Sequence, residues 1–342
     1  MKKNLVIINN EKCIKKESGI FCENLEISSI TELLGKKFNL KLILRESIAS
    51  PAHLIDNKDI KINSNIFFFI MSVIRSAIKD KSSYLIISVT PYTFASFVFL
   101  FLLRKKMFLY LRSDGKKEIS AIFGRKVSII YKFVENLMVN FCDLIVVNNL
   151  ISKKKECHLV SPSQIDEEWS LNIKNTERNQ IKLLYVGRLK IEKGIFSLID
   201  IFNNTKIDHK KEISLTLIGQ GNKPKNFNNK IKFVDQISSK RDLIKQYDSH
   251  DIFILPSFTE GHPQVLIESL IRQRPVIVFR DIEHVSQNYE GVFVIDRSPK
   301  DLSNIIEFID KNYNEILERM KKNKYPTKEN FSNQLYTILS QN

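Results

Sequence analysis

Residues 252–279 read IFILPSFTEGHPQVLIESLIRQRPVIVF. The stretch begins and ends with short apolar runs, which favour β-strands at Ile252–Leu255 and Val276–Phe279. Between them, Pro263 stands where the first residue of a helix is expected. The stretch therefore predicts a strand, a helix over Pro263–Ile271 and a second strand, which is the repeating unit of a parallel α/β sheet.

The same alternation extends through the chain in both directions. Further strands of the second half are expected at Lys182–Val186, Ser214–Ile218, Ile231–Val234 and Val292–Ile295. Strands of the first half are expected at Leu5–Ile8, Leu40–Leu44, Tyr84–Val89, Met107–Leu111 and Leu144–Val147. The sequence therefore predicts an α/β fold with two Rossmann-like, doubly wound domains that face an interdomain cleft. Ligands of such sheets bind at the carboxyl ends of the strands.

A polar and locally acidic segment, residues 161–180, interrupts the alternation. We place the domain boundary within this segment, so that the first domain covers residues 1–170 and the second covers residues 171–325. Residues 326–342 are expected to form a C-terminal helix that packs back on the first domain.

Composition and charge narrow the class of partner. The chain has 342 residues, of which 43% are hydrophobic and 27% are charged, and this excludes fibrous and disordered proteins. The formal net charge of +15 favours anionic partners. Basic clusters at residues 104–106, 116–117 and 153–155 fit either an anionic membrane surface or ordinary solvated charge, and both interpretations stay open. No nucleic-acid-binding motif is evident, so nucleic acid is not an expected partner.

The cysteines and the most apolar segment indicate in which cellular compartment the protein works and whether it crosses a membrane. The four cysteines show no paired spacing, which indicates reduced thiols in the cytoplasm. The segment Phe94–Leu103 is too short to span a bilayer and is followed by Arg104. We therefore predict a buried helix there.

The loop GRLKIEKG, residues 187–194, follows a predicted strand and precedes a predicted helix. Gly187 allows the backbone to approach a ligand, and the helix N-terminus offers free amides and the positive end of a dipole. Arg188 and Lys193 add two cations, so the loop is suited to a diphosphate. A strand that runs into Gly219 and Gly221 gives a second, weaker signal of the same kind.

Two carboxylates lie in the stretch quoted first. Glu260 is in the loop after a strand, and Glu268 is in the helix that follows. A carboxylate accepts hydrogen bonds from sugar hydroxyls, and a carboxylate on a helix can grip the vicinal diol of a ribose. General acid and base roles, and a simple solvated pair, are the alternatives. A buried Glu268 would need a partner, and a ligand hydroxyl would serve.

Together these motifs resemble the second domain of the retaining glycosyltransferases of family four, a GT-B group that uses nucleotide-diphosphate sugars. The resemblance covers residues 181–296 and is carried by the Glu-x7-Glu spacing of Glu260 and Glu268, by RQRPVIV after the helix, and by GRLKIEKG. It implies a GT-B fold whose first domain binds the acceptor and whose second domain binds the nucleotide sugar.

The resemblance also implies roles for single residues. Arg188 and Lys193 would bind the donor diphosphate, Glu260 the transferred sugar and Glu268 the ribose. The remaining implied donor contacts are Gly187, Gln236 and Ile237 near the base, and Gly261, His262 and Pro263. The implied catalytic groups are Arg188, Lys193 and Glu260, with no metal ion and no other cofactor, and we add Asp114 of the first domain as a fourth candidate.

The first domain departs from the family pattern at two places. A longer stretch, INNEKCIKKESG, replaces the glycine-rich loop after the first strand and leaves a single Gly19. The segment LYLRSDG stands where many members of the family have a histidine. We therefore assign Gly19, Arg112 and Asp114 to the acceptor side, and Asp114 to the sugar, against the alternative of a structural turn residue.

The expected activity is transfer of a sugar to a glycan or lipid-linked glycan acceptor in bacterial lipopolysaccharide, O-antigen or capsule assembly. The protein would then be cytoplasmic or peripheral on the inner face of the cytoplasmic membrane. Two alternatives stay open: a catalytically silent glycosyltransferase-like partner subunit, and a nucleotide-sugar epimerase of the same fold.

Overall fold

The computed structural model describes residues 2–47, 53–79, 81–113, 115–148, 151, 156–174, 179–205, 211–223 and 227–341. The chain divides into two compact units, residues 1–164 with 327–342, and residues 165–326. The division lies before the predicted boundary at residue 170 because Ile165 and Trp169 already belong to the second hydrophobic core. Within the described residues, no helix is both long and apolar enough to cross a membrane.

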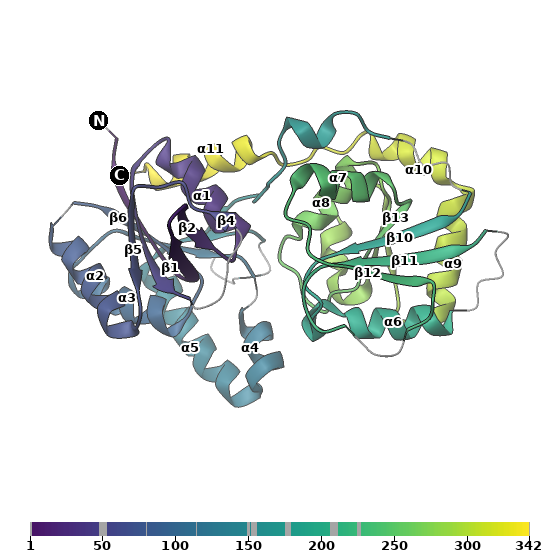
Figure 1. Ribbon diagram of the computed structural model, residues 1–342. Helices are drawn as coiled ribbons and strands as arrows, with labels where there is room; N and C mark the ends of the chain where they lie inside the picture. The colour runs from purple at the N-terminus through teal and green to yellow at the C-terminus, as the bar shows by residue number, and fades with distance from the viewer. Residues whose placement is uncertain are drawn as a thin grey trace. The chain divides into compact units, whose positions relative to one another are not determined.

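The first unit is built on a nine-stranded sheet (Figure 1). Its helices and strands are β1 (Asn4–Lys16), β2 (Gly19–Cys22), α1 (Leu25–Gly35), β3 (Asn39–Glu46), β4 (His53–Leu54), β5 (Asp59–Asn63), α2 (Ile66–Lys79), β6 (Ser83–Ile87), α3 (Pro91–Leu102), β7 (Met107–Leu111), α4 (Gly115–Phe123), α5 (Arg125–Phe141), β8 (Asp143–Val146), β9 (His158–Leu159) and α11 (Lys328–Leu339). The parallel strands run in the order β5-β3-β1-β6-β7-β8-β9. Helices α1 and α11 lie on one side of this sheet, and α2, α3 and α5 lie on the other.

The first strand is much longer than predicted. Residues 9–16, which the sequence analysis treated as a loop, continue β1, and the chain then turns back into β2. In this antiparallel hairpin the backbone of Cys13 lies opposite that of Cys22, and both thiols are free. The register of β1 against β3 shifts between Ile8 and Lys12. On its other side, β1 pairs with β6 up to Asn9 and with β2 from Cys13 onward. The short apolar run Leu5–Ile8 marks only the part of the strand that is buried in the parallel sheet.

The predicted C-terminal helix, α11, belongs to the first unit. Phe331 and Leu335 are fully buried in the first hydrophobic core. Lys328 forms an ion pair with Glu32 of α1, with 2.7 Å between Nζ and Oε2. Thr327 caps the start of the helix through the backbone N–H of Asn330.

The second unit holds a six-stranded, fully parallel sheet in the order β12-β11-β10-β13-β14-β15. Its elements are η1 (Glu167–Ser170), β10 (Ile181–Val186), η2 (Ile191–Lys193), α6 (Ile195–Asn204), β11 (Ile213–Ile218), β12 (Ile231–Val234), α7 (Lys240–Asp248), β13 (Ile252–Leu255), α8 (Gln264–Ile271), β14 (Val276–Phe279), η3 (Arg280–Ser286), β15 (Val292–Ile295), α9 (Pro299–Lys311) and α10 (Tyr313–Met320). Every residue of β13 and β14 is buried, as expected for strands covered by helices on both faces.

Helix α3 forms where the sequence predicts a buried helix, but its end is not buried. Phe97 and Leu100 pack in the core, whereas Phe101 and Leu102 are 44% and 69% exposed. Only one side of the helix contacts the sheet and the neighbouring helices. Because apolar residues occur on every side of α3, those on the opposite side are exposed at the surface.

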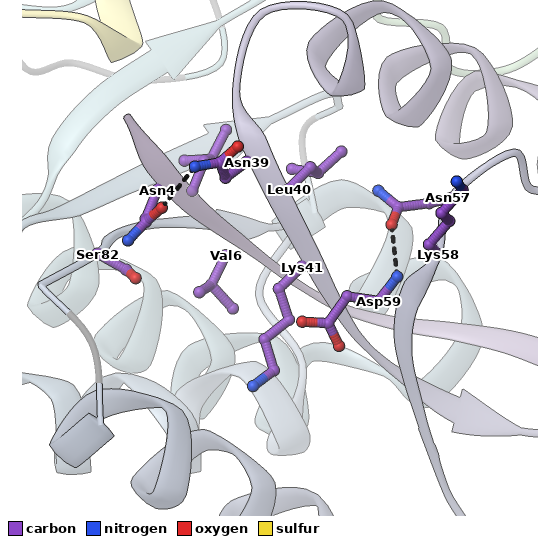
Figure 2. A pocket seen from close by; sticks show the side chains of 10 residues that line it. Asn4, Val6, Asn39, Leu40, Lys41, Asn57, Lys58, Asp59 and Ser82 are labelled. Atoms are coloured by element: carbon purple, nitrogen blue, oxygen red, sulfur yellow. Dashed lines mark hydrogen bonds between the residues drawn. The ribbon is translucent and has the colours of Figure 1, made fainter. Parts of the chain in front are cut away.

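One pocket of the first unit, about 310 Å³ in volume, is drawn in Figure 2. Asn4 and Asn39, at the starts of β1 and β3, lie in its wall and share a hydrogen bond of 3.1 Å. Asp59 at the start of β5 also lines it. These are the amino ends of parallel strands, opposite to the edge at which such sheets bind ligands, so we place no function there.

Candidate functional site

The strand order of the second unit defines a ligand edge at the carboxyl ends of β10 and β13. β10 pairs with β11 on one side and with β13 on the other, so the chain leaves these two strands in opposite directions. Such a reversal opens a crevice outside the carboxyl ends of the strands. The predicted loops GRLKIEKG and PSFTEGHP follow β10 and β13, and the fold therefore brings both to this edge.

The glycines after β11 allow the loop after β10 to pack closely. Gly219 has a φ of 152°, and a Cβ atom there would lie 1.8 Å from the carbonyl oxygen of Gly187. Gly187 donates its N–H to Ile218, and Leu189 forms a bridge with Gly221. The weak Gly-x-Gly signal thus serves the packing of the loop that carries Arg188.

Lys193 and Glu260 form an ion pair across the two loops. Lys193 Nζ lies 2.7 Å from Glu260 Oε1, and the hydroxyl of Ser257 donates a hydrogen bond of 2.6 Å to the same oxygen. The side chains of Lys193 and Glu260 are 22% and 12% exposed, so the pair is largely removed from water. One ligand that bears both a phosphate and a sugar would therefore meet both side chains.

The start of α6 is fixed against the loop after β13. Lys193 ends the short turn η2, and Gly194 follows in the left-handed region with a φ of 69°. A Cβ atom on Gly194 would lie 1.9 Å from the carbonyl oxygen of Pro256. No side chain of the described residues caps α6, so its first amides and its positive dipole end lie beside the Lys193–Glu260 pair.

The other predicted diphosphate and sugar contacts lie in the same loops. Arg188 is exposed, and its carbonyl oxygen accepts a hydrogen bond of 3.0 Å from the hydroxyl of Tyr185. Gly261 and His262 are half-buried between Glu260 and α8. Pro263 is buried and precedes the helix, which begins at the next residue and not at Pro263 as predicted, because the ψ of Pro263 is extended at 114°.

Glu268 is buried in α8 and has a protein partner. Its Oε2 accepts a hydrogen bond of 2.8 Å from the hydroxyl of Tyr247 in α7. Burial raises the pKa of Glu268 to about 7, and the Tyr247 hydrogen bond acts in the opposite direction. The sequence analysis expected a ligand hydroxyl to satisfy this carboxyl, and Tyr247 was not foreseen because nothing in its spacing links it to Glu268.

The predicted base contacts follow β12. Gln236 is exposed and Ile237 is half-buried against the second core, in the loop that leads to α7. This loop lies at the carboxyl end of its strand, as do the loops after β10 and β13, because the whole sheet is parallel. The fold therefore places Gln236 and Ile237 on the same edge of the sheet as Lys193.

A cation that the sequence analysis missed holds the backbone before Glu260. Arg297, which follows β15, donates hydrogen bonds to the carbonyl oxygens of Pro256 at 2.7 Å and Ser257 at 3.3 Å. Its Nε lies 2.8 Å from Asp281 Oδ2. No motif marks Arg297, because it reaches this loop only through the pairing of β13, β14 and β15.

Two aromatic rings and an imidazole complete the support of this loop. The guanidinium of Arg297 lies 4.0 Å from the ring centre of Phe258 and 4.5 Å from that of Phe279. His284 Nε2 lies 2.9 Å from the carbonyl oxygen of Glu260. The backbone on both sides of the Glu260 side chain is thus anchored.

The predicted acceptor-side residues lie in the first unit, and a cluster forms around one of them. Arg112 follows β7, and its Nη1 lies 3.0 Å from Oε2 of Glu26 in α1. Tyr110 donates a hydrogen bond of 2.9 Å to the other oxygen of Glu26. Gly19 pairs with Lys16 at the turn of the β1–β2 hairpin.

Two further predictions concern a carboxylate of the first unit and the absence of a metal ion. Asp114 lies outside the described residues. Among the residues that are described, no group of three or more histidine, cysteine, aspartate or glutamate side chains is arranged to hold a metal ion. Independence from metal stays a prediction.

The comparison with known structures bears on the fold. The Anabaena protein Alr3699/HepE, solved with UDP and glucose, aligns with a TM-score of 0.71 over 99% of this chain and 100% of that one, at 14% identity. WaaG, a glycosyltransferase involved in lipopolysaccharide biosynthesis, aligns with a TM-score of 0.65 over 99% and 100%, at 10% identity. These likenesses confirm the predicted GT-B fold class.

Sequence relatives match only part of the chain. The chain is 32% identical to the amylovoran biosynthesis glycosyltransferase AmsD of Erwinia amylovora over 108 residues. These residues make up 30% of this chain and 30% of AmsD. The chain is 34% identical over 94 residues to TuaC of Bacillus subtilis, which is named for teichuronic acid biosynthesis. These residues make up 28% of this chain and 23% of TuaC. The matched stretches span less than a third of each relative.

The family model described as glycosyl transferases group 1 matches residues 167–327. This range begins in η1 and extends through α10, so it contains both loops and both carboxylates of the site. The second unit is therefore similar in sequence to the glycosyl transferases group 1 family over nearly its whole length.

Proposed function

We propose that the chain is a glycosyltransferase that moves a sugar from a nucleotide-diphosphate sugar to an acceptor hydroxyl. The observation that carries this proposal is the Lys193–Glu260 ion pair beside the start of α6, at the carboxyl ends of β10 and β13. A diphosphate and a sugar at this edge would meet a cation, helix amides and a carboxylate together. The complex of Alr3699/HepE with UDP and glucose and the names of the relatives support it.

Each side chain then has a distinct task. Lys193, Arg188 and the first amides of α6 stabilise the charge that develops on the leaving diphosphate. Glu260 accepts hydrogen bonds from the sugar, and Glu268 binds the ribose. Gln236 and Ile237 frame the base. The catalytic contribution is largely electrostatic and needs no metal ion to neutralise the diphosphate.

We further propose that the reaction retains the anomeric configuration, as the family resemblance implies. The acceptor oxygen attacks the anomeric carbon from the side on which the bond to the diphosphate breaks. The diphosphate leaves with the electron pair of that bond, next to Lys193, and its leaving oxygen takes the proton of the acceptor hydroxyl. In the first unit, Gly19, Arg112 and Asp114 are the residues that we assign to the acceptor.

The proposed acceptor is a glycan or lipid-linked glycan in bacterial surface polysaccharide assembly. The names of AmsD, TuaC and WaaG support this class, since they refer to amylovoran, teichuronic acid and lipopolysaccharide biosynthesis. A lipid-linked acceptor requires the enzyme to work in the cytoplasm at the inner face of the cytoplasmic membrane, and the basic first unit suits that surface.

The first test is thermal stabilisation by a panel of nucleoside diphosphates and their sugars, without metal. A ligand at one hundred times its dissociation constant adds about 2.7 kcal/mol to the free energy of unfolding. A selective shift with one base and one sugar is expected and would name the donor. No shift with any of them would favour the silent partner subunit.

The second test is release of the nucleoside diphosphate with and without acceptor. A glycosyltransferase releases it when a glycan acceptor is added, whereas an epimerase of this fold releases it without one. A silent subunit releases none under either condition. Acceptor-dependent release is the expected result.

A further inference from the structure

Helix α5 turns an apolar side toward solvent. Ile129, Ile130 and Phe133 are 61%, 66% and 71% exposed, and Phe141 at the helix end is 51% exposed. Their spacing places them on one face of the helix. By contrast, Glu135 of the same helix is 3% exposed. Helix α5 buries Met138 and Val139 in the first core, so it carries apolar side chains on both sides. A surface helix normally exposes a polar side, and the exposed apolar side therefore indicates a contact with something apolar.

The apolar surface continues onto α3. The ring of Phe101, in the last turn of α3, lies 4.8 Å from the ring of Phe141 in an edge-to-face contact. The two helices lie next to each other on one side of the first sheet (Figure 1). We call the exposed surface formed by Phe101, Ile129, Ile130, Phe133 and Phe141 the α3–α5 face.

The charges around the α3–α5 face are mainly positive, and Asp143 is an exposed carboxylate just after α5. Arg125 and Lys126 are exposed at the start of α5, and Arg104 is exposed just after α3. The only acidic residue in the sequence of α3 and α5 is Glu135, which is buried and paired with Lys132. The face therefore combines exposed apolar side chains with exposed cations that have no acidic neighbour on the same two helices.

We propose that the α3–α5 face docks on a bilayer that contains anionic phospholipids. Aromatic and aliphatic side chains would enter the boundary between headgroups and acyl chains, and Arg104, Arg125 and Lys126 would contact the lipid phosphates. A second copy of this chain fits less well, because an isologous contact would bring Arg104, Arg125 and Lys126 together with more cations than the exposed Asp143 can offset. This inference rests on the proposed function in that both place the chain at a membrane surface, and it adds which face of the first unit makes the contact.

Sedimentation of the full chain with vesicles tests the proposal. The wild type is expected to bind vesicles of phosphatidylcholine and phosphatidylglycerol and to bind pure phosphatidylcholine weakly. The double substitution Ile130→Ser and Phe133→Ser should lower partitioning onto anionic vesicles by about tenfold or more. The matched control is Phe308→Ser, which removes an exposed phenylalanine of α9 in the second unit and should leave partitioning unchanged.

A tryptophan probe reports insertion directly. The only native tryptophan, Trp169, is buried in the second unit. Phe133→Trp should therefore add an emission that brominated lipids quench, while Trp169 emission stays unquenched. Equal partitioning of the wild type and the double variant onto anionic vesicles would overturn the proposal. A wild type that does not bind anionic vesicles would also overturn it. So would a wild-type dimer that the double variant dissociates.

These readouts are independent of the donor site. Stabilisation by a nucleoside diphosphate should be the same in the wild type and in the double variant, because the α3–α5 face lies in the first unit and Lys193 in the second. Loss of vesicle binding with intact nucleotide binding is the expected pattern. Failure of nucleotide binding in both proteins would refute the proposed function. Membrane docking would still be tested by the sedimentation of both proteins with vesicles.

Discussion

The hydroxyl of Tyr247 donates a hydrogen bond of 2.8 Å to Glu268, and both side chains are buried inside the second unit. Burial raises the pKa of Glu268 to about 7, and the hydrogen bond from Tyr247 opposes that rise. The group proposed to bind the ribose therefore changes its charge near neutral pH, and Tyr247 helps to decide which form is present.

Tyr247→Phe is expected to weaken nucleoside diphosphate binding at neutral pH. The substitution keeps the buried ring but removes the hydrogen bond that lowers the pKa of Glu268, so a smaller fraction of the carboxyl is ionised. Binding should recover as the pH is raised, and calorimetric titration across the pH range measures this. Tyr313→Phe, which removes another buried hydroxyl of the second unit, is the control. Superimposable pH profiles for wild type and Tyr247→Phe would contradict the assignment.

Glu268→Gln should change how stability depends on pH. The pKa of Glu268 is raised from 4.5 to about 7 in the folded protein, so the carboxyl favours folding fully below pH 4.5 and this contribution is lost as the pH rises to about 7. The unfolding free energy of the wild type should therefore fall, relative to the variant, by about 3 kcal/mol over that interval. Urea titrations followed by Trp169 fluorescence report on the second unit. A constant difference would show that the pKa of Glu268 is not raised.

Lys193→Ala is expected to weaken nucleoside diphosphate binding by about tenfold or more, because a charge-assisted hydrogen bond to the phosphates is lost. Nucleoside binding without phosphates should not change. Lys190→Ala, at an exposed lysine of the same loop, is the matched control. Calorimetry on both variants separates a phosphate contact from a general charge effect, and equal affinities for Lys193→Ala and wild type would rule out the phosphate role.

Gly194→Ala should destabilise the second unit more than a positive φ alone can explain. At Gly194 the new Cβ would clash with Pro256, whereas at Gly124, with a φ of 83°, nothing lies within 4 Å of the added atom. Gly124→Ala should therefore cost about 1–2 kcal/mol of backbone strain in the first unit, and Gly194→Ala should cost more in the second. Urea unfolding measured by circular dichroism and by Trp169 fluorescence compares them. Equal losses would mean that the α6 start moves freely away from Pro256.

Arg297→Met should slow sugar transfer without weakening nucleoside diphosphate binding. The guanidinium positions the loop of Glu260, which is proposed to contact the sugar, through Pro256 and Ser257. It touches the start of α6 only through a long hydrogen bond of 3.5 Å to the hydroxyl of Ser197. Steady-state kinetics should show a lower kcat/KM for the nucleotide sugar. Arg280→Met breaks an exposed ion pair with Asp296 and should have little effect. A matching loss of nucleoside diphosphate affinity in Arg297→Met would point to a collapsed loop instead.

The fold was largely predictable because parallel strands are short, apolar and separated by helices. In the second unit the predicted strands Ile231–Val234, Ile252–Leu255 and Val276–Phe279 coincide with β12, β13 and β14. The first unit deviates at β1, where the residues beyond Ile8 pair in a hairpin. Alternation of polar and apolar residues in such a two-stranded ribbon is weak, so hydrophobic runs alone do not reveal it.

The candidate site was predictable only as loops. The motifs indicate that Lys193 and Glu260 follow different strands, and the sheet order then brings these strands together. The contact with Ser257, the partner Tyr247 and the anchor Arg297 depend on side-chain positions in space. No spacing in the sequence encodes such distances, which is why the supporting residues were missed.

Helix α11 gives the chain a particular order of assembly. Phe331 and Leu335 fill the core of the first unit, yet the ribosome makes them after the whole of the second unit. In terms of connectivity, the second unit is an insertion between two parts of the first. The first unit can therefore complete its core only after the second has been synthesised. A nascent chain thus passes through a stage in which the second unit is complete while the first unit still lacks α11.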